Sequence, residues 1–158
     1  MLVLFFVSAG LLLFFFRRSG TEKNDESDYE RFSRTMEHFS VLEEIAMDAM
    51  QPSDSLTKQE FLIQLKKTAL VDWTECVNLM DEAREMKLSP ALQALRADLV
   101  VYSNHRIQET LLYIRANEEG TNKYNKSIDS IQRGITALID VMKVQHRPTP
   151  YKGPSRDL

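Results

Sequence analysis

The sequence predicts an all-α protein: a single N-terminal transmembrane helix followed by an antiparallel bundle of about four helices. Three observations predict this fold. An almost unbroken apolar run opens the chain. In the remainder, apolar residues recur at steps of three and four, as they do along one face of a helix. The 158 residues include five glycines, which is few for the many turns of an all-β chain.

The opening run, residues 2–16, is apolar except for Ser8 and Gly10 and ends at Arg17 and Arg18. A helix of this length spans roughly 24 Å, against about 30 Å for the hydrocarbon core of a bilayer. Arginine side chains that reach the headgroups, together with local thinning of the bilayer, absorb the difference. The run also lacks the polar face of a globular helix. We therefore predict a membrane anchor over residues 1–18. Its membrane-contacting residues are Leu2, Leu4, Phe5, Phe6, Leu11, Leu12, Leu13, Phe14, Phe15, Phe16, Arg17 and Arg18.

A cleaved secretory signal and an interfacial hairpin are the alternatives for this segment. A signal peptide begins with basic residues and ends in small residues at its cleavage site, whereas here the two arginines occupy that place. An uncleaved single-pass anchor fits better. Because Arg17 and Arg18 follow the span, the positive-inside rule predicts a cytoplasmic folded domain.

Residues 19–27, SGTEKNDES, are polar and aperiodic, which predicts a flexible tether. Ser27 and Glu30 then match a capping box, the start signal of a helix. Pro52 ends that helix, because proline disfavours helical geometry in the residue before it. The apolar stripe of this first helix consists of Phe32, Met36, Phe39, Leu42, Ala46 and Met50.

Thr57 and Glu60 form a second capping-box pattern, and helical periodicity continues from there to about Leu88. We expect one long element, kinked or straight; the alternative is a break at which Asp72 caps a new helix. The apolar arc is broad, which predicts a central place in the bundle. Its stripe consists of Phe61, Leu65, Ala69, Trp73, Cys76, Met80 and Ala83.

Ser89 and Pro90 predict the start of a third helix, as N-cap and first helical residue. The segment 99–102 alone also suits a strand, but strong helix formers flank it. This helix is expected to reach about Asn117, with Gly120 available as a left-handed cap. Its stripe consists of Leu92, Leu95, Leu99, Tyr102, Arg106, Thr110 and Ile114.

The last helix has the most regular pattern, with apolar steps alternating between four and three in a heptad seam. We predict that this seam mediates helix interactions. Its members are Tyr124, Ile128, Ile131, Ile135, Leu138 and Met142. The bundle would span residues 28–146. The proline-containing residues 147–158 are expected to be an extended or disordered tail, with docking on a partner or on anionic lipid as the alternative.

No pattern for catalysis or for a metal is present, so no enzymatic activity, catalytic residue, metal ligand or cofactor is predicted. His105 and Glu109 share a helix face, but they make at most half of a metal site. Cys76 lies on an apolar stripe and is expected to be a buried, inert thiol. The pairs Glu43-Glu44 and Glu118-Glu119 resemble solvated surface. The net charge of −3 offers no footprint for nucleic acid.

The predicted function is a non-enzymatic, membrane-anchored helical bundle that acts as an adaptor or scaffold. Its partners would be the lipid bilayer and an unknown protein or a second copy of the chain. The alternative is an extracytoplasmic ligand-binding or sensory bundle, with an apolar cavity among its methionines and aromatic residues. The two differ in sidedness and in whether the bundle is hollow. Those methionines are Met36, Met47, Met50, Met80, Met86 and Met142.

Overall fold

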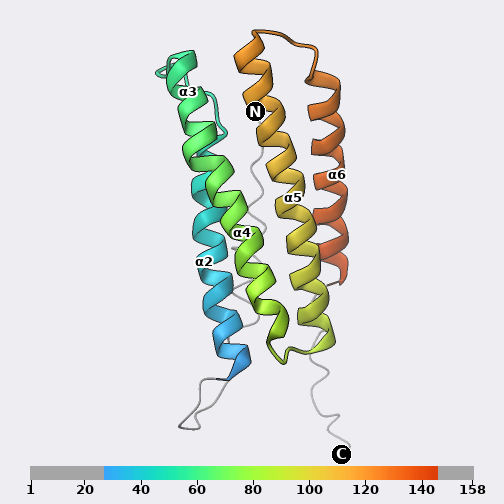
Figure 1. Cartoon of the computed structure of the whole chain (residues 1–158). Helices are drawn as coiled ribbons and strands as arrows, with labels where there is room; N and C mark the ends of the chain where they lie inside the picture. The colour runs from blue at the N-terminus through green and yellow to red at the C-terminus, as the bar shows by residue number, and fades with distance from the viewer. Residues whose placement is uncertain (1–26, 146–158) are drawn as a thin grey trace, which may run out of the picture.

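The computed structural model describes residues 27–145, in which every secondary structure element is a helix. Four helical rods lie along one another, and consecutive rods run antiparallel (Figure 1). They are α2 (Asp28–Ala49); the rod made of α3 (Lys58–Gln64), η1 (Leu65–Ala69), α4 (Leu70–Glu82) and η2 (Ala83–Glu85); α5 (Pro90–Glu119); and α6 (Asn125–Gln145). For residues 27–145, the prediction of an all-α bundle of about four helices is confirmed.

The predicted anchor at 1–18, most of the tether at 19–27 and the tail at 147–158 lie outside the described residues. Between residues 27 and 145, no helix has both the length and the apolar character that crossing a membrane requires.

Helix starts and ends follow the local signals in the sequence. The hydroxyls of Ser27, Thr57 and Ser89 accept hydrogen bonds from backbone amides in the first turn of the helices that follow them. At Ser27 and Thr57 a glutamate completes the capping box. Gly120 ends α5 in the left-handed conformation, with φ of 60°.

The second rod is one continuous helical path with an irregular turn, and there is no break at Asp72. A π-helical turn, η1, joins α3 to α4, and Asp72 lies inside α4. A π-turn accommodates one more residue than an α-helical turn and so rotates the buried face of the helix. Leu65 and Ala69 are both fully buried at this turn.

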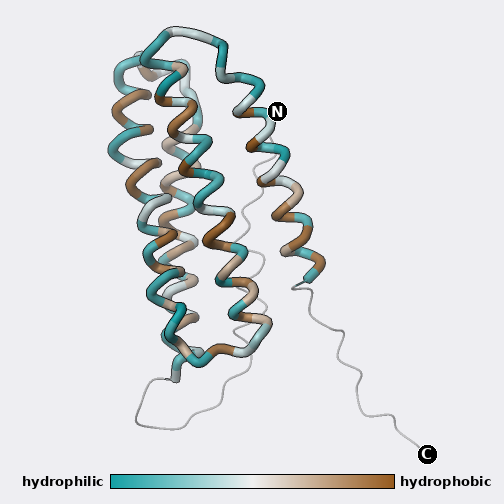
Figure 2. Tube along the Cα trace, turned by 45° about the vertical axis from the view of Figure 1, so that its right-hand side comes forward, coloured by the Kyte–Doolittle hydropathy of each residue, from teal (hydrophilic) through white to brown (hydrophobic). Residues whose placement is uncertain are grey.

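The rods pack in the order α2, α4, α5, α6. The long helix α5 contacts α4 and α6, whereas α2 packs mainly against α4 and η1. Along each rod apolar and polar residues alternate with helical period (Figure 2). The predicted stripes form one core, in which Phe39, Trp73 and Met80 are at most 1% exposed.

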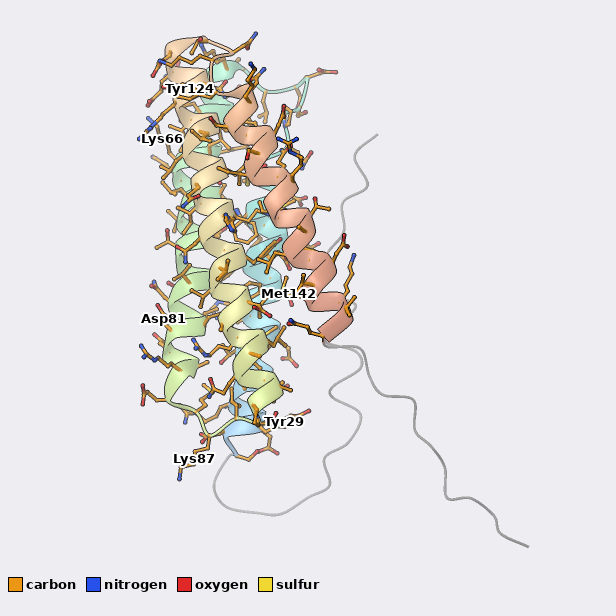
Figure 3. The ribbon with its side chains drawn as sticks, turned by 90° about the vertical axis from the view of Figure 1, so that its right-hand side faces the viewer. Tyr29, Lys66, Asp81, Lys87, Tyr124 and Met142 are labelled. Carbon is orange, nitrogen blue, oxygen red and sulfur yellow. The ribbon has the colours of Figure 1, made fainter. Side chains whose placement is uncertain are left out.

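The two ends of the bundle are tied by contacts between elements distant in sequence. At one end lie Tyr29 and Lys87, where the backbone N–H of Lys87 donates to Asp28 Oδ2 over 2.8 Å (Figure 3). At the other end lie Lys66 and Tyr124 (Figure 3), where Lys66 forms an ion pair with Glu118. Both contacts are exposed, so each contributes little to stability.

Candidate functional site

A chain of polar side chains runs through the middle of the bundle and joins three helices. Glu43 is 1% exposed and Glu109 is 2% exposed, and buried carboxylates are rare unless they are paired. Convergence of buried charged groups is a common property of functional sites. The members of this buried polar network are Glu43 of α2, Tyr102, Arg106, Glu109 and Tyr113 of α5, and Gln132 of α6.

Tyr102 links α5 to α2. Its hydroxyl donates to Glu43 Oε1 over 2.7 Å, a charge-assisted bond when the carboxylate is ionised. Burial, and then the charge of Glu43, raise the pKa of Tyr102 well above its usual range. The phenol therefore keeps its proton at neutral pH and acts as the donor.

Arg106 is the cation of the network. Its Nε donates to the Tyr102 hydroxyl over 3.4 Å, and its Nη1 donates to Glu109 Oε2 over 2.8 Å. The guanidinium also lies 5.9 Å from the ring centroid of Trp73 and 5.3 Å from that of Tyr102, within cation–π range. Burial acts to lower the pKa of Arg106, but Tyr102 and Glu109 outweigh it, so the pKa rises.

Gln132 brings α6 into the network. Its side-chain amide donates to Glu109 Oε1 over 2.8 Å and lies 3.1 Å from the Tyr113 hydroxyl. Glu109 therefore accepts from Arg106 on one oxygen and from Gln132 on the other. Burial, and then the charge of Glu109, raise the pKa of Tyr113.

Aromatic and sulfur contacts connect the rod that contains α4 to the buried polar network. The Trp73 and Tyr102 rings meet edge to face, with centroids 5.6 Å apart and planes at 85°. The indole Nε1 of Trp73 donates to Met50 Sδ over 3.3 Å, and the Thr110 hydroxyl lies 3.4 Å from the same sulfur. Side chains from all four rods therefore belong to the buried polar network or contact it.

The buried polar network fixes the relative positions of the helices. Its hydrogen bonds are directional, and a buried polar group that loses its partner costs more than an apolar contact that slips. A sliding or rotated helix would break these bonds while leaving much of the apolar contact intact. Such networks specify one arrangement among several that apolar packing alone allows.

Sequence reasoning missed most of this network. Glu43 was expected at the surface beside Glu44, and that expectation is wrong for Glu43, which is buried, while Glu44 is exposed. Glu43 stands four residues after Phe39 and three before Ala46, and so on the apolar face. Arg106 lies in the apolar stripe of the third predicted helix, and an arginine on a buried face was a signal that a carboxylate had to lie beside it.

The predicted seam of α6 lies on the inward face of the helix. Ile128, Ile135 and Met142 are buried, whereas Tyr124, Ile131 and Leu138 are half-buried. Met142 points from α6 toward the other rods (Figure 3). The seam is thus engaged within the chain, and sequence reasoning did not include Ile139, which is 8% exposed.

Two other residues that were considered for chemistry, Glu109 and Cys76, are buried among side chains of the bundle. Glu109, which shares a helix face with His105, is engaged by Arg106 and Gln132. Within residues 27–145 no group of three or more His, Cys, Asp or Glu side chains is placed to hold a metal. Cys76 is fully buried, and burial, followed by Glu43, raises the pKa of its thiol far above its usual range.

Among the hollows on the surface of the described part, one lies at the α5–α6 turn and another lies along α6. One, of about 270 Å³, lies between the start of α3 and the α5–α6 turn, beside Lys58, Tyr113 and Gly120. The other, of about 540 Å³, lies along α6 beside Gln132 and Arg133, and its lining among residues 27–145 is entirely polar or charged. Neither resembles the mainly apolar pockets that hold small ligands.

Comparison with known protein families, with curated proteins and with solved structures finds no match to this chain. The described residues form a four-rod antiparallel helical bundle with a buried polar network.

Proposed function

We propose that this chain is a non-enzymatic interaction protein, in which an N-terminal membrane anchor holds a helical bundle at a bilayer surface as an adaptor or scaffold. The proposal rests on the position in the sequence at which the folded bundle begins. Ser27 caps α2, so the described bundle starts directly after the polar stretch that follows Arg18. A bundle this close to an apolar run would remain next to the membrane surface.

Tethering explains how such a bundle could act without tight binding. Confinement to a surface raises the effective concentration of a bound module, so that weak contacts become occupied. Exposed apolar side chains on several rods offer such contacts, among them Val41 of α2 and Val144 of α6, which are 53% and 66% exposed. The two arginines support a single-pass topology with a cytoplasmic bundle.

The described core gives less support to the alternative, a hollow ligand-binding or sensory bundle. Met36, Met80 and Met142 are at most 5% exposed and belong to one packed core cluster. Met50 is 7% exposed, and its sulfur is a hydrogen-bond acceptor for Trp73. These methionines behave as packing side chains.

Membrane attachment is tested by fractionation of the full chain beside a variant that lacks residues 2–16. The full chain should stay in the membrane pellet after extraction at alkaline pH, whereas the deletion variant should be released and keep its helical circular dichroism. Release of the full chain, or an intact mass that shows a cleaved N-terminus, would contradict the anchor.

Sidedness is tested with Asn24→Cys and an impermeant maleimide. The native thiol of Cys76 is buried and should stay unlabelled while the bundle is folded. Labelling only after permeabilisation places the bundle in the cytoplasm, as proposed. Labelling of intact cells would favour the extracytoplasmic alternative.

A further inference from the structure

We propose that α6 pairs with α6 of a second copy of this chain, antiparallel, through a stripe on its outer face. The stripe recurs at alternating steps of three and four, as in a heptad seam. All of its members are exposed and none is charged. The outer stripe consists of Ser127, Ser130, Gly134, Ala137, Val141 and Val144.

The C-terminal half of the outer stripe, Ala137, Val141 and Val144, is apolar although it is exposed to solvent. Val141 and Val144 are 46% and 66% exposed, although the inward face of α6 already supplies the apolar contacts of this helix to the bundle. A Cβ atom added at Gly134 would meet nothing within 4 Å, so the helix surface there is open to a close neighbour. Among residues 27–145, the inward face of α6 is thus covered by the other helices and the outer stripe is left exposed.

In an antiparallel pair, the outer stripe of one chain meets the outer stripe of a second copy, and the residues that face each other match in size. When Gly134 lies opposite Ala137 of the second copy, Ser130 lies opposite Val141 and Ser127 lies opposite Val144. Each layer then pairs a smaller residue with a larger one, which allows two helices to approach closely. A two-fold axis repeats every layer, as in an isologous dimer.

The charges that flank the outer stripe select the same partner and the same direction. Arg133 and Asp140 immediately precede Gly134 and Val141, so they lie on one flank and are both exposed. Among residues 27–145 neither takes part in an ion pair. In the antiparallel register Arg133 faces Asp140 of the second copy, and the axis makes this pair twice. A parallel in-register pair would place Arg133 beside Leu138 of the second copy and form no such ion pair, and flanking charges set partner and orientation.

This inference deepens the proposed interaction role by naming the partner and the surface, and it rests on that role but not on membrane attachment. Pairing is measured on the full chain purified in a mild detergent, whereas attachment is measured by fractionation, so either result can fail alone.

Mixed disulfides test direction and register together. Ser130→Cys and Val141→Cys are prepared separately, then mixed and oxidised with oxidised glutathione. The mixture should form a disulfide dimer. Each variant alone should not, because the two copies of one residue would lie 11 positions apart, about 16 Å along the helix. The matched control is Asn104→Cys, at an exposed position of α5, mixed with Val141→Cys. This mixture should stay monomeric on a gel run without reducing agent.

A charge exchange tests the partner. Arg133→Asp alone and Asp140→Arg alone place like charges opposite each other, and each should weaken dimerisation about tenfold in sedimentation velocity. An equimolar mixture of the two variants restores both pairs and should dimerise as the unmodified chain does. Circular dichroism checks that each variant remains folded.

Two results obtained without the charge variants would overturn the proposal. One is a disulfide in the single variants as strong as in the mixture, which indicates parallel or random contact. The other is a monomeric chain without a mixed disulfide across micromolar concentrations. Equal dimerisation of the unmodified chain and both charge variants would likewise show that the second copy does not bind at this surface.

Discussion

Tyr102 of α5 donates a hydrogen bond of 2.7 Å to Glu43 of α2, a residue 59 positions earlier in the chain. Both side chains are at most 1% exposed. A polar pair this deeply buried ties two helices that are not consecutive in the chain, and its partners are replaceable one at a time.

Removal of the Tyr102 hydroxyl should destabilise the bundle. Tyr102→Phe keeps the ring that packs on Trp73 but leaves Glu43 Oε1 without this donor, so we expect a loss of about 1–3 kcal/mol in the free energy of unfolding. Urea titration, followed by the fluorescence of the single tryptophan, measures it. Tyr124→Phe is the control, because its hydroxyl bonds Glu119 at the surface, and it should change stability little. Equal effects of the two substitutions would contradict the importance of the buried bond.

The Arg106–Glu109 pair should show strong coupling. Arg106→Met leaves Glu109 buried without its cation and should cost about 3–5 kcal/mol, because breaking one side of a buried ion pair leaves an uncompensated charge. The double variant Arg106→Met with Glu109→Gln should recover part of that loss. A double-mutant cycle from urea titrations gives the coupling energy. Simple additivity of the two single effects would show that the pair does not act as a unit.

Stability should fall at alkaline pH. Burial raises the pKa of Tyr102, Tyr113 and Cys76 in the folded chain. These groups lose protons first in the unfolded chain, so their contribution is complete below their unfolded pKa values, about 8.5 for Cys and 10 for Tyr, and is lost as pH rises through the folded values.

The slope can reach about 1.4 kcal/mol per pH unit for each proton. Urea midpoints measured from pH 7 to 11 should therefore decrease, and Tyr102→Phe should show a shallower decline above pH 10 than the unmodified chain. A decline of unchanged slope in this variant would exclude Tyr102 as a source.

Two glycines should respond in opposite ways to alanine. Gly134→Ala should stabilise the chain by up to about 1 kcal/mol, because a Cβ there meets open space and glycine is a poor helix former. Gly120→Ala should destabilise it by about 1–2 kcal/mol, because φ of 60° is strained for a residue with a side chain. Thermal unfolding at low protein concentration compares both. Stabilisation by Gly120→Ala would contradict the left-handed cap.

Local signals determined where the helices begin and end. Ser27, Thr57 and Ser89 cap the helices that their patterns predicted, and Gly120 adopts the left-handed cap. These features depend on backbone groups within four residues, so a short stretch of sequence contains all of the information. Apolar periodicity likewise indicated most of the core, because a residue's place on a helix face follows from its spacing.

Contacts between distant residues had to be found in three dimensions. Periodicity places Arg106 on a buried face but does not reveal that Tyr102 and Glu109 hold it, or that Gln132 reaches across from another helix. The π-turn at Leu65–Ala69 also depends on packing, since it rotates the faces before and after it relative to their neighbours.

The sequence by itself determined the all-α class, the number of helical rods in the bundle and their boundaries, because capping and periodicity are local properties. Tertiary structure alone decided that Glu43 is buried while Glu44 is exposed, and that the heptad seam of α6 faces inward and leaves Val141 and Val144 outside. The physical reason is that a helix has several faces of similar polarity. Which face is covered depends on where the other helices lie.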